Sequence, residues 1–156
     1  RKAERTRLRA ERMELSVANR TAAGEALAGH LRQVLRNQFD GARGMILSAY
    51  WPIKGEPDLR SLMGELHETG VVIAFPVVET RFAPLIFRCW TPETHMVRGD
   101  WNIPVPPSGS PVVTPTIALA PLVGWTEDGY RLGYVGVFRP NAGSVEATTL
   151  CYRYRF

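Results

Sequence analysis

The fold is decided by residues 45–75, MILSAYWPIKGEPDLRSLMGELHETGVVIAF. This segment begins with a short apolar run at residues 45–50 and ends with a second at residues 71–75, and both predict buried strands. Between them, apolar residues recur at helical spacing in residues 59–68, and Gly70 ends that helix. A strand, a helix and a strand in this order predict a right-handed crossover between two parallel strands. We therefore expect an α/β fold with a mostly parallel sheet.

The segments on either side extend the same sheet. Residues 1–39 contain no proline and predict two helices, with Ser16 as the N-cap of the second. We assign His30 to the apolar stripe of that second helix, as a residue packed in the core. Residues 85–90 predict an antiparallel strand, and residues 117–123 predict a buried one. The N-terminal helices would pack on this sheet.

The composition is that of a soluble globular protein. The 156 residues are 45% hydrophobic and 22% charged, which is an ordinary balance for a domain large enough to bury a core. No apolar run reaches the roughly 18 residues that span a bilayer, and no signal segment opens the chain. Cys89 and Cys151 make no disulfide framework, so we expect a cytoplasmic protein. Since there is no initiator methionine, we expect a trimmed N-terminus.

Much of the net charge of +4 lies in the first predicted helix. A solvated helix face is the simplest interpretation. Nucleic-acid binding is the weaker alternative, because no aromatic residues interleave the basic ones and no recognition motif follows. A narrower hypothesis is that Arg1, Arg5 and Arg12, which are spaced by whole turns, point together at one anion.

Two segments predict a ligand site at one edge of the sheet. Residues 129–134, GYRLGY, follow a buried strand and supply two glycines and a planar cation, which suit a phosphate group. Glu56 follows the first strand, and ligands in parallel sheets collect at the carboxyl ends of the strands.

Three blocks stand in order along the chain: residues 55–60 (GEPDLR), 101–104 (WNIP), and 121–124 (PLVG) with 129–134 (GYRLGY). With LIFR at residues 85–88 and Trp90 between them, the chain resembles the 5-formyltetrahydrofolate cyclo-ligase (methenyltetrahydrofolate synthetase) family from its basic helix to Tyr134. The resemblance implies a Rossmann-like three-layer α/β/α fold. It also implies ATP-dependent closure of 5-formyltetrahydrofolate to 5,10-methenyltetrahydrofolate, with ATP and Mg²⁺ required and ADP and phosphate released. We expect a monomer that acts on these small molecules.

The resemblance also implies a phosphorylated N5 imine intermediate and roles for particular residues. Such chemistry depends on positioning and on a cage of donors, each worth about 3 kcal/mol of barrier. The residues that look like ATP ligands are Arg1 or Lys2, Arg5, Arg131, Gly133, Tyr134 and Gly136, with Arg131 as the catalytic cation. The residues that look like folate ligands are Tyr50, Glu56 and Trp101. Alternative interpretations are a first-turn helix acid for Glu56 and core packing for Trp101.

The resemblance breaks after Tyr134. There the family pattern expects three glycines, two aromatic residues and then Asp-Arg, whose aspartate helps to bind magnesium. Val135 and Val137 replace two of the glycines, and β-branched residues resist positive φ. Pro140 replaces the aspartate and removes both a charge and an N–H, so no metal ligand is assigned.

A frameshift would explain this break. Residues 139–143 permit codons that spell Asp-Arg-Thr-Leu when shifted by one base, and we hypothesise that such a shift follows Tyr134. Residues 150–156 alternate like a strand, but they place arginines where a buried sheet needs apolar residues. We therefore expect a cyclo-ligase-like domain at residues 1–134, and a divergent tail at residues 135–156 with incomplete C-terminal strands. Impaired activity, or a non-catalytic folate- or nucleotide-binding remnant, would follow.

Overall fold

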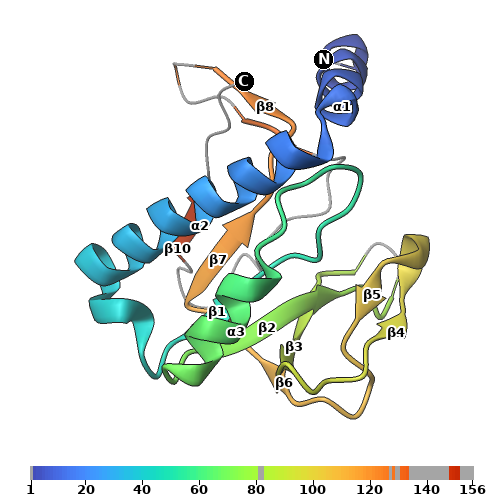
Figure 1. Ribbon diagram of the computed structural model, residues 1–156. Helices are drawn as coiled ribbons and strands as arrows, with labels where there is room; N and C mark the ends of the chain where they lie inside the picture. The colour runs from blue at the N-terminus through green and yellow to red at the C-terminus, as the bar shows by residue number, and fades with distance from the viewer. Residues whose placement is uncertain (1, 81–82, 127, 129–130, 134–147, 152–156) are drawn as a thin grey trace.

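The computed structural model describes residues 2–80, 83–126, 128, 131–133 and 148–151 (Figure 1). Its centre is a six-stranded sheet with the strand order β10-β7-β1-β2-β3-β6. The bounds of these strands are β1 Ile46–Ser48, β2 Val72–Val77, β3 Ile86–Trp90, β6 Val112–Val113, β7 Ile117–Ala120 and β10 Thr148–Cys151.

The middle of the sheet is parallel, as the sequence predicts. Leu47 of β1 pairs with Ile73 of β2 on one side and with Ile117 of β7 on the other. Both of these ladders are parallel, and β10 extends the parallel part beyond β7. β3 is antiparallel to β2 and to β6, which confirms the antiparallel addition predicted at residues 85–90. The α/β fold class is therefore confirmed.

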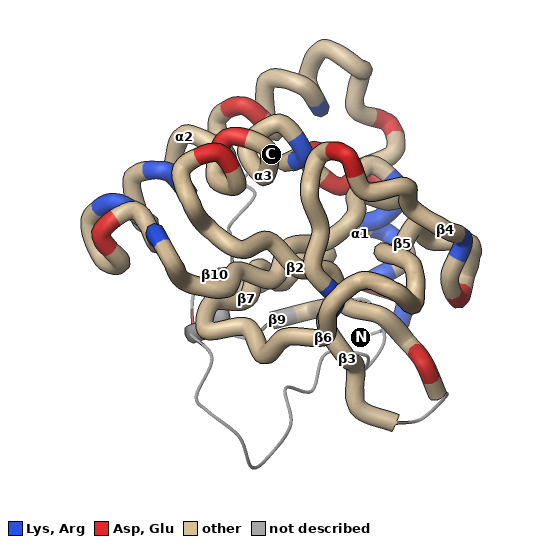
Figure 2. Tube along the Cα trace, turned by 90° about the horizontal axis from the view of Figure 1, so that it is seen from below, with Lys and Arg blue, Asp and Glu red and all other residues tan. Residues whose placement is uncertain are grey.

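In the part of the chain that the structure describes, three α-helices accompany the sheet: α1 Lys2–Glu14, α2 Val17–Phe39 and α3 Arg60–Glu68. The Ser16 side chain accepts a hydrogen bond of 3.1 Å from the backbone N–H of Asn19, which confirms the predicted N-cap. α2 and α3 lie on the same face of the sheet (Figures 1 and 2). They supply one of the two helical layers of the three-layer arrangement that the sequence predicts.

The apolar stripe of α2 differs from the predicted one. Leu27, Leu31 and Leu35 are buried against the sheet, together with Gly24 and Ala28. His30 is exposed, so its assignment to the core was wrong. The leucines follow a strict i, i+4, i+8 row, and His30 lies on the other side of that row.

The core between the helices and the sheet is closed by aromatic side chains. The ring of Phe75 lies 6.0 Å from that of Trp51 and 5.7 Å from that of Trp90, between ring centroids. These tilted and edge-on geometries are favourable for aromatic pairs. Trp51 begins the loop that leaves β1, so the core anchors the start of that loop.

Two small hairpins and two 3₁₀ turns complete the described chain. Their bounds are η1 Asp40–Ala42, β4 Val97–Arg98, η2 Asp100–Asn102, β5 Pro104–Val105, β8 Gly124–Trp125 and β9 Arg131–Leu132. β4 pairs with β5 and β8 with β9, both antiparallel. None of the helices in the described part of the chain has the length and apolar character needed to cross a lipid bilayer.

The predicted tail contributes β10, which is parallel to β7 at the edge of the sheet. The strand predicted near the C-terminus thus begins at Thr148, two residues earlier than expected. Residues 134–147 and 152–156 lie outside the described residues.

Candidate functional site

Helix α1 lies apart from α2 and α3, at the end of the sheet toward which β7 points (Figure 1). Its middle packs on the β8–β9 hairpin. Arg5 Nε donates a hydrogen bond of 2.9 Å to the carbonyl oxygen of Gly133. A Cβ on Gly124 would lie 2.6 Å from Leu8 Cδ1, so the helix approaches the hairpin closely at this glycine. Helix α1 is therefore a neighbour of Gly133, one of the residues that the family resemblance assigns to ATP.

The other end of α1 packs on the loop that follows β1. A Cβ on Gly55 would lie 3.3 Å from Met13 Sδ and 3.5 Å from Arg12 Cγ, and the φ of Gly55 is +76°. Both the positive φ and the close helix favour glycine here. α1 is thus a common wall for the loop that carries Glu56 and for the β8–β9 hairpin.

Glu56 is held by its own turn. Its Oε2 accepts a hydrogen bond of 3.0 Å from the backbone N–H of Ile53, and its own N–H donates to the Ile53 carbonyl. Burial raises the pKa of the Glu56 carboxyl group, and this effect is opposed by the Ile53 N–H and by the charges of Arg12 and Lys54. A buried carboxyl group whose pKa is shifted by its surroundings is typical of functional sites.

The residues that flank Glu56 explain why it is not a helix cap. Helix α3 begins at Arg60, and Asp58 Oδ1 accepts the Arg60 N–H at 3.0 Å. Asp58 therefore acts at the start of α3, and the helix-acid interpretation of Glu56 is not supported. The Tyr50 hydroxyl donates to the Pro57 carbonyl at 2.7 Å, and its ring is buried in the core. In this geometry Tyr50 fixes the loop next to Glu56.

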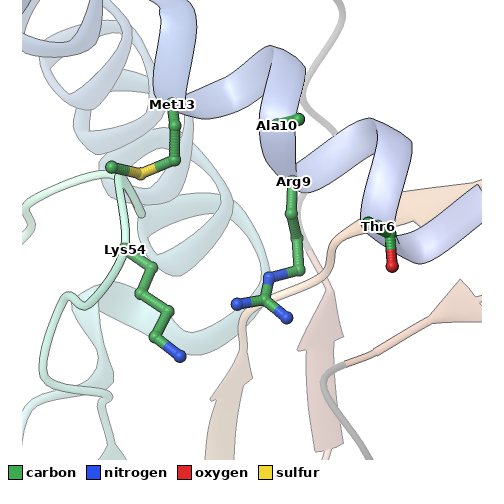
Figure 3. Close-up of a pocket in the computed structure, with 5 residues that line it drawn as sticks. All are labelled: Thr6, Arg9, Ala10, Met13 and Lys54. Carbon is green, nitrogen blue, oxygen red and sulfur yellow. The ribbon is translucent and has the colours of Figure 1, made fainter.

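A hollow of about 360 Å³ lies between α1 and the loop after β1 (Figure 3). It is lined by Thr6, Arg9, Ala10, Met13 and Lys54. The side chains of Arg9 and Lys54 converge from the helix and from the loop (Figure 3). The hollow is thus formed by one side of α1 together with Lys54, which precedes Gly55 in the loop. Two cations at such a position suit an anionic group.

Trp101 is 70% exposed, so the core-packing interpretation was wrong. It lies in η2 between β4 and β5 with a φ of +52°, which is rare for an aromatic residue. β5 contacts β2, which places this hairpin beside the parallel part of the sheet. Trp101 is not among the residues that line the hollow.

Of the remaining candidate ligands of ATP, the structure describes only some. Lys2 is exposed at the first position of α1. The backbone of Arg131 pairs with that of Trp125 in the β8–β9 hairpin. Arg1, Tyr134, Gly136 and Pro140 lie outside the described residues. Within the described ranges, no group of three or more His, Cys, Asp or Glu side chains lies together as a candidate metal site.

The sequence predicts no role for Arg9 or Lys54, and it indicates Arg12 only through the hypothesis that Arg1, Arg5 and Arg12 point together at one anion. Arg9 is four residues after Arg5 and shares its face of the helix, so its spacing could have indicated it. Arg12 is 7% exposed and lies against Gly55, whereas Arg5 bonds to Gly133. Arg5 and Arg12 thus contact different loops.

The chain has a mostly parallel sheet, and the loops that carry the candidate residues lie at the carboxyl ends of its strands. This is the architecture of α/β proteins that bind small molecules at that edge of the sheet. Within that class, the chain belongs to the 5-formyltetrahydrofolate cyclo-ligase family, whose model matches residues 1–138. This is a family of ligases of one-carbon folate metabolism. No curated protein matches the chain.

Two solved structures share the fold. The Aquifex aeolicus 5,10-methenyltetrahydrofolate synthetase superposes with a TM-score of 0.78 at 23% identity, covering 98% of this chain and 77% of that one. The 5,10-methenyltetrahydrofolate synthetase from Mycoplasma pneumoniae gives 0.65 at 20% identity, covering 86% and 71%. The sheet and helices described above are thus those of a known enzyme fold.

Replacing Gly55 by alanine is expected to weaken folate binding about 10-fold. The new Cβ would strain the backbone at positive φ and press on Met13 and Arg12, which would displace the turn that orients Glu56. Gly41→Ala is the matched control, because Gly41 has a φ of +75° but open space around the added Cβ. Titration of 5-formyltetrahydrofolate into both variants checks this, and equal affinities would show that the contact with α1 has no role.

Proposed function

We propose that the chain descends from, and retains the ligand site of, an enzyme that closes 5-formyltetrahydrofolate to 5,10-methenyltetrahydrofolate with ATP. Glu56 would accept hydrogen bonds from the pterin ring, and α1 with the β8–β9 hairpin would hold the triphosphate. The observation that carries this proposal is that one helix contacts both regions, through Arg5 with Gly133 and through Arg12 and Met13 with Gly55. Family membership supports the reaction type.

In the proposed reaction the formyl oxygen attacks the γ-phosphorus of ATP, and the bond from that phosphorus to the bridging oxygen breaks as ADP leaves. The N5 imine phosphate is then attacked by N10 at the formyl carbon, and inorganic phosphate leaves. The protein would contribute mainly orientation and positive charge. Arg9 and Lys54, which line the hollow beside α1, would add positive charge near the site while the phosphoryl group passes from ATP to the folate. Arg131 is proposed as the cation on the transferring group.

We further propose that turnover by this chain is impaired. Val135, Val137 and Pro140 stand where the family pattern has two glycines and an acidic residue. No step of the proposal runs through a metal ion. A folate-binding remnant without turnover is the second candidate, and Pro140 is the observation that favours it. The cytoplasmic location and the monomeric state remain predictions.

The proposal is tested by incubating the purified chain with 5-formyltetrahydrofolate, ATP and Mg²⁺ and measuring ADP release. Slow, folate-dependent release supports an impaired ligase. Folate binding without ADP release selects the remnant. Absence of folate binding at millimolar concentrations would overturn both. Sequencing the gene beyond Tyr134 tests the frameshift, because the shifted frame must spell Asp-Arg-Thr-Leu.

Arg5→Gln is expected to raise the dissociation constant for ATP about 10-fold or more, because the charge and the bond that orders Gly133 are both lost. Arg7→Gln is the control, since Arg7 is exposed and pairs with Glu4 and Glu11 on its own helix. Calorimetric titration with ATP measures both. The same loss in the two variants would mean that only the net charge of α1 matters.

A further inference from the structure

Arg12 is a buried cation, two of whose nitrogens make no hydrogen bond to the described residues. Its residue is 7% exposed, and its Nε and Nη2 have no hydrogen-bond partner among the described residues. Buried polar groups in native proteins are almost always bonded, and an orphaned charged donor is costly. An ordered water or a polar group of a ligand can complete such donors.

The position of Arg12 indicates which group of a ligand could accept hydrogen bonds from its Nε and Nη2. Arg12 follows Arg5 by seven residues, so both lie on the face of α1 that meets the two loops. Its Cγ lies 3.5 Å from the position of a Cβ on Gly55, directly beside Glu56 in the chain. Arg9 and Met13, which line the hollow, flank it on the helix. The charge of Arg12 also lowers the pKa of the Glu56 carboxyl group, which burial raises, so the two side chains are near enough to interact. Two Arg12 nitrogens without hydrogen-bond partners therefore lie near a carboxylate acceptor.

This pairing of donor and acceptor matches one edge of a pterin ring. A 2-amino-4-oxopteridine presents two donors, the N3–H and the 2-amino group, and beside them an acceptor, the O4 oxygen. A carboxylate such as Glu56 can accept from the two donors, and O4 then needs a donor beside that carboxylate. Arginine provides several N–H groups in a fixed planar geometry.

We propose that Arg12 donates a hydrogen bond to O4 of the pterin and thereby selects 4-oxo over 4-amino pteridines. The inference rests on the proposed folate site and adds to it the residue that reads position 4. Arg12 is then a specificity residue that touches the substrate, whereas Glu56 holds the ring. A 4-amino group would turn a donor toward the Arg12 donors and leave both unpaired.

The test compares two ligands in several variants: pteroylglutamate and its 4-amino-4-deoxy counterpart, with dissociation constants from calorimetry. Arg12→Met keeps much of the apolar stem and removes the donors. It is expected to weaken the 4-oxo ligand about 10-fold or more and to change the 4-amino ligand less than about 2-fold. Arg12→Lys keeps the charge but not the planar guanidinium group. It should also reduce the preference for the 4-oxo ligand over the 4-amino ligand, by a smaller factor than Arg12→Met. Arg36→Met, at an exposed position of α2, should change neither.

The outcomes separate this inference from the function on which it rests. If Arg12→Met and Arg12→Lys weaken both ligands by the same factor, Arg12 has a structural role only and the inference is overturned. If the unaltered protein binds neither ligand, the folate site itself fails. Thermal unfolding shows whether the variants are folded.

Discussion

Replacing Val135 and Val137 by glycine and Pro140 by aspartate should raise folate-dependent ADP release about 100-fold or more. Glycines at the first two positions would permit positive φ and close approach of the backbone to phosphate. An aspartate would restore an acidic group, and each donor or ligand in such a cage is worth about 3 kcal/mol, which is a factor of about 100 in rate. The rate of ADP release at saturating 5-formyltetrahydrofolate and ATP measures the gain.

The matched control replaces the same residues by groups that restore neither property. In Val135→Ala/Val137→Ala/Pro140→Asn the β-branching and the proline are removed, but the positive φ stays unfavourable and no charge returns. We expect this variant to remain as slow as the parent. Equal rates in all three proteins would mean that the altered glycine segment is not what limits turnover.

Glu56→Gln should have two effects of opposite sign. It removes the charge that accepts from the pterin, so affinity for 5-formyltetrahydrofolate is expected to fall about 10- to 100-fold. It should also stabilise the ligand-free protein at neutral pH. Burial raises the pKa of Glu56 above its value in the unfolded chain, so the folded state binds the proton more tightly. The free energy of unfolding therefore falls as the pH rises from the unfolded-state pKa through the folded-state pKa of Glu56. Glutamine is neutral and avoids this cost.

Thermal unfolding at about pH 3 and about pH 8, below and above the ordinary glutamate range, checks both effects. At the higher pH the variant should melt above the parent and gain less on adding 5-formyltetrahydrofolate. At the lower pH, where Glu56 is protonated in both states, the difference should shrink. Glu68→Gln, an exposed position near the end of α3, should change neither value. A melting temperature that falls at the higher pH would show that the Glu56 charge stabilises the fold.

The parallel unit at the centre of the fold was predictable from local pattern. Residues 45–75 contain two short apolar runs, and between them lies one segment with apolar residues at helical spacing. Because such crossovers are right-handed, only one arrangement of the two strands and the helix remains. The exposure of His30 was not predictable in this way. It depends on which of two adjacent rows of α2 faces the sheet, and the docking of Gly24 against Asp58, with 3.2 Å from an added Cβ to the Asp58 carbonyl oxygen, fixes that choice.

The site was partly predictable for a similar reason. Glu56 and the glycine segment follow strands, so topology brings them to one edge. The contribution of Lys54 and the burial of Arg12 depend on how α1 docks across two loops. That docking is long-range: Arg5 and Gly133 are 128 residues apart in the chain. Neither helical period nor composition carries information about such a contact.

A paired titration tests the central claim that α1 joins a folate region and a nucleotide region. Dissociation constants for 5-formyltetrahydrofolate and for ATP should be measured by calorimetry in the parent, in Glu56→Gln and in Arg5→Gln. We predict that Glu56→Gln weakens only the folate, by about 10-fold or more, and that Arg5→Gln weakens only ATP. Unchanged folate affinity in Glu56→Gln would contradict the account.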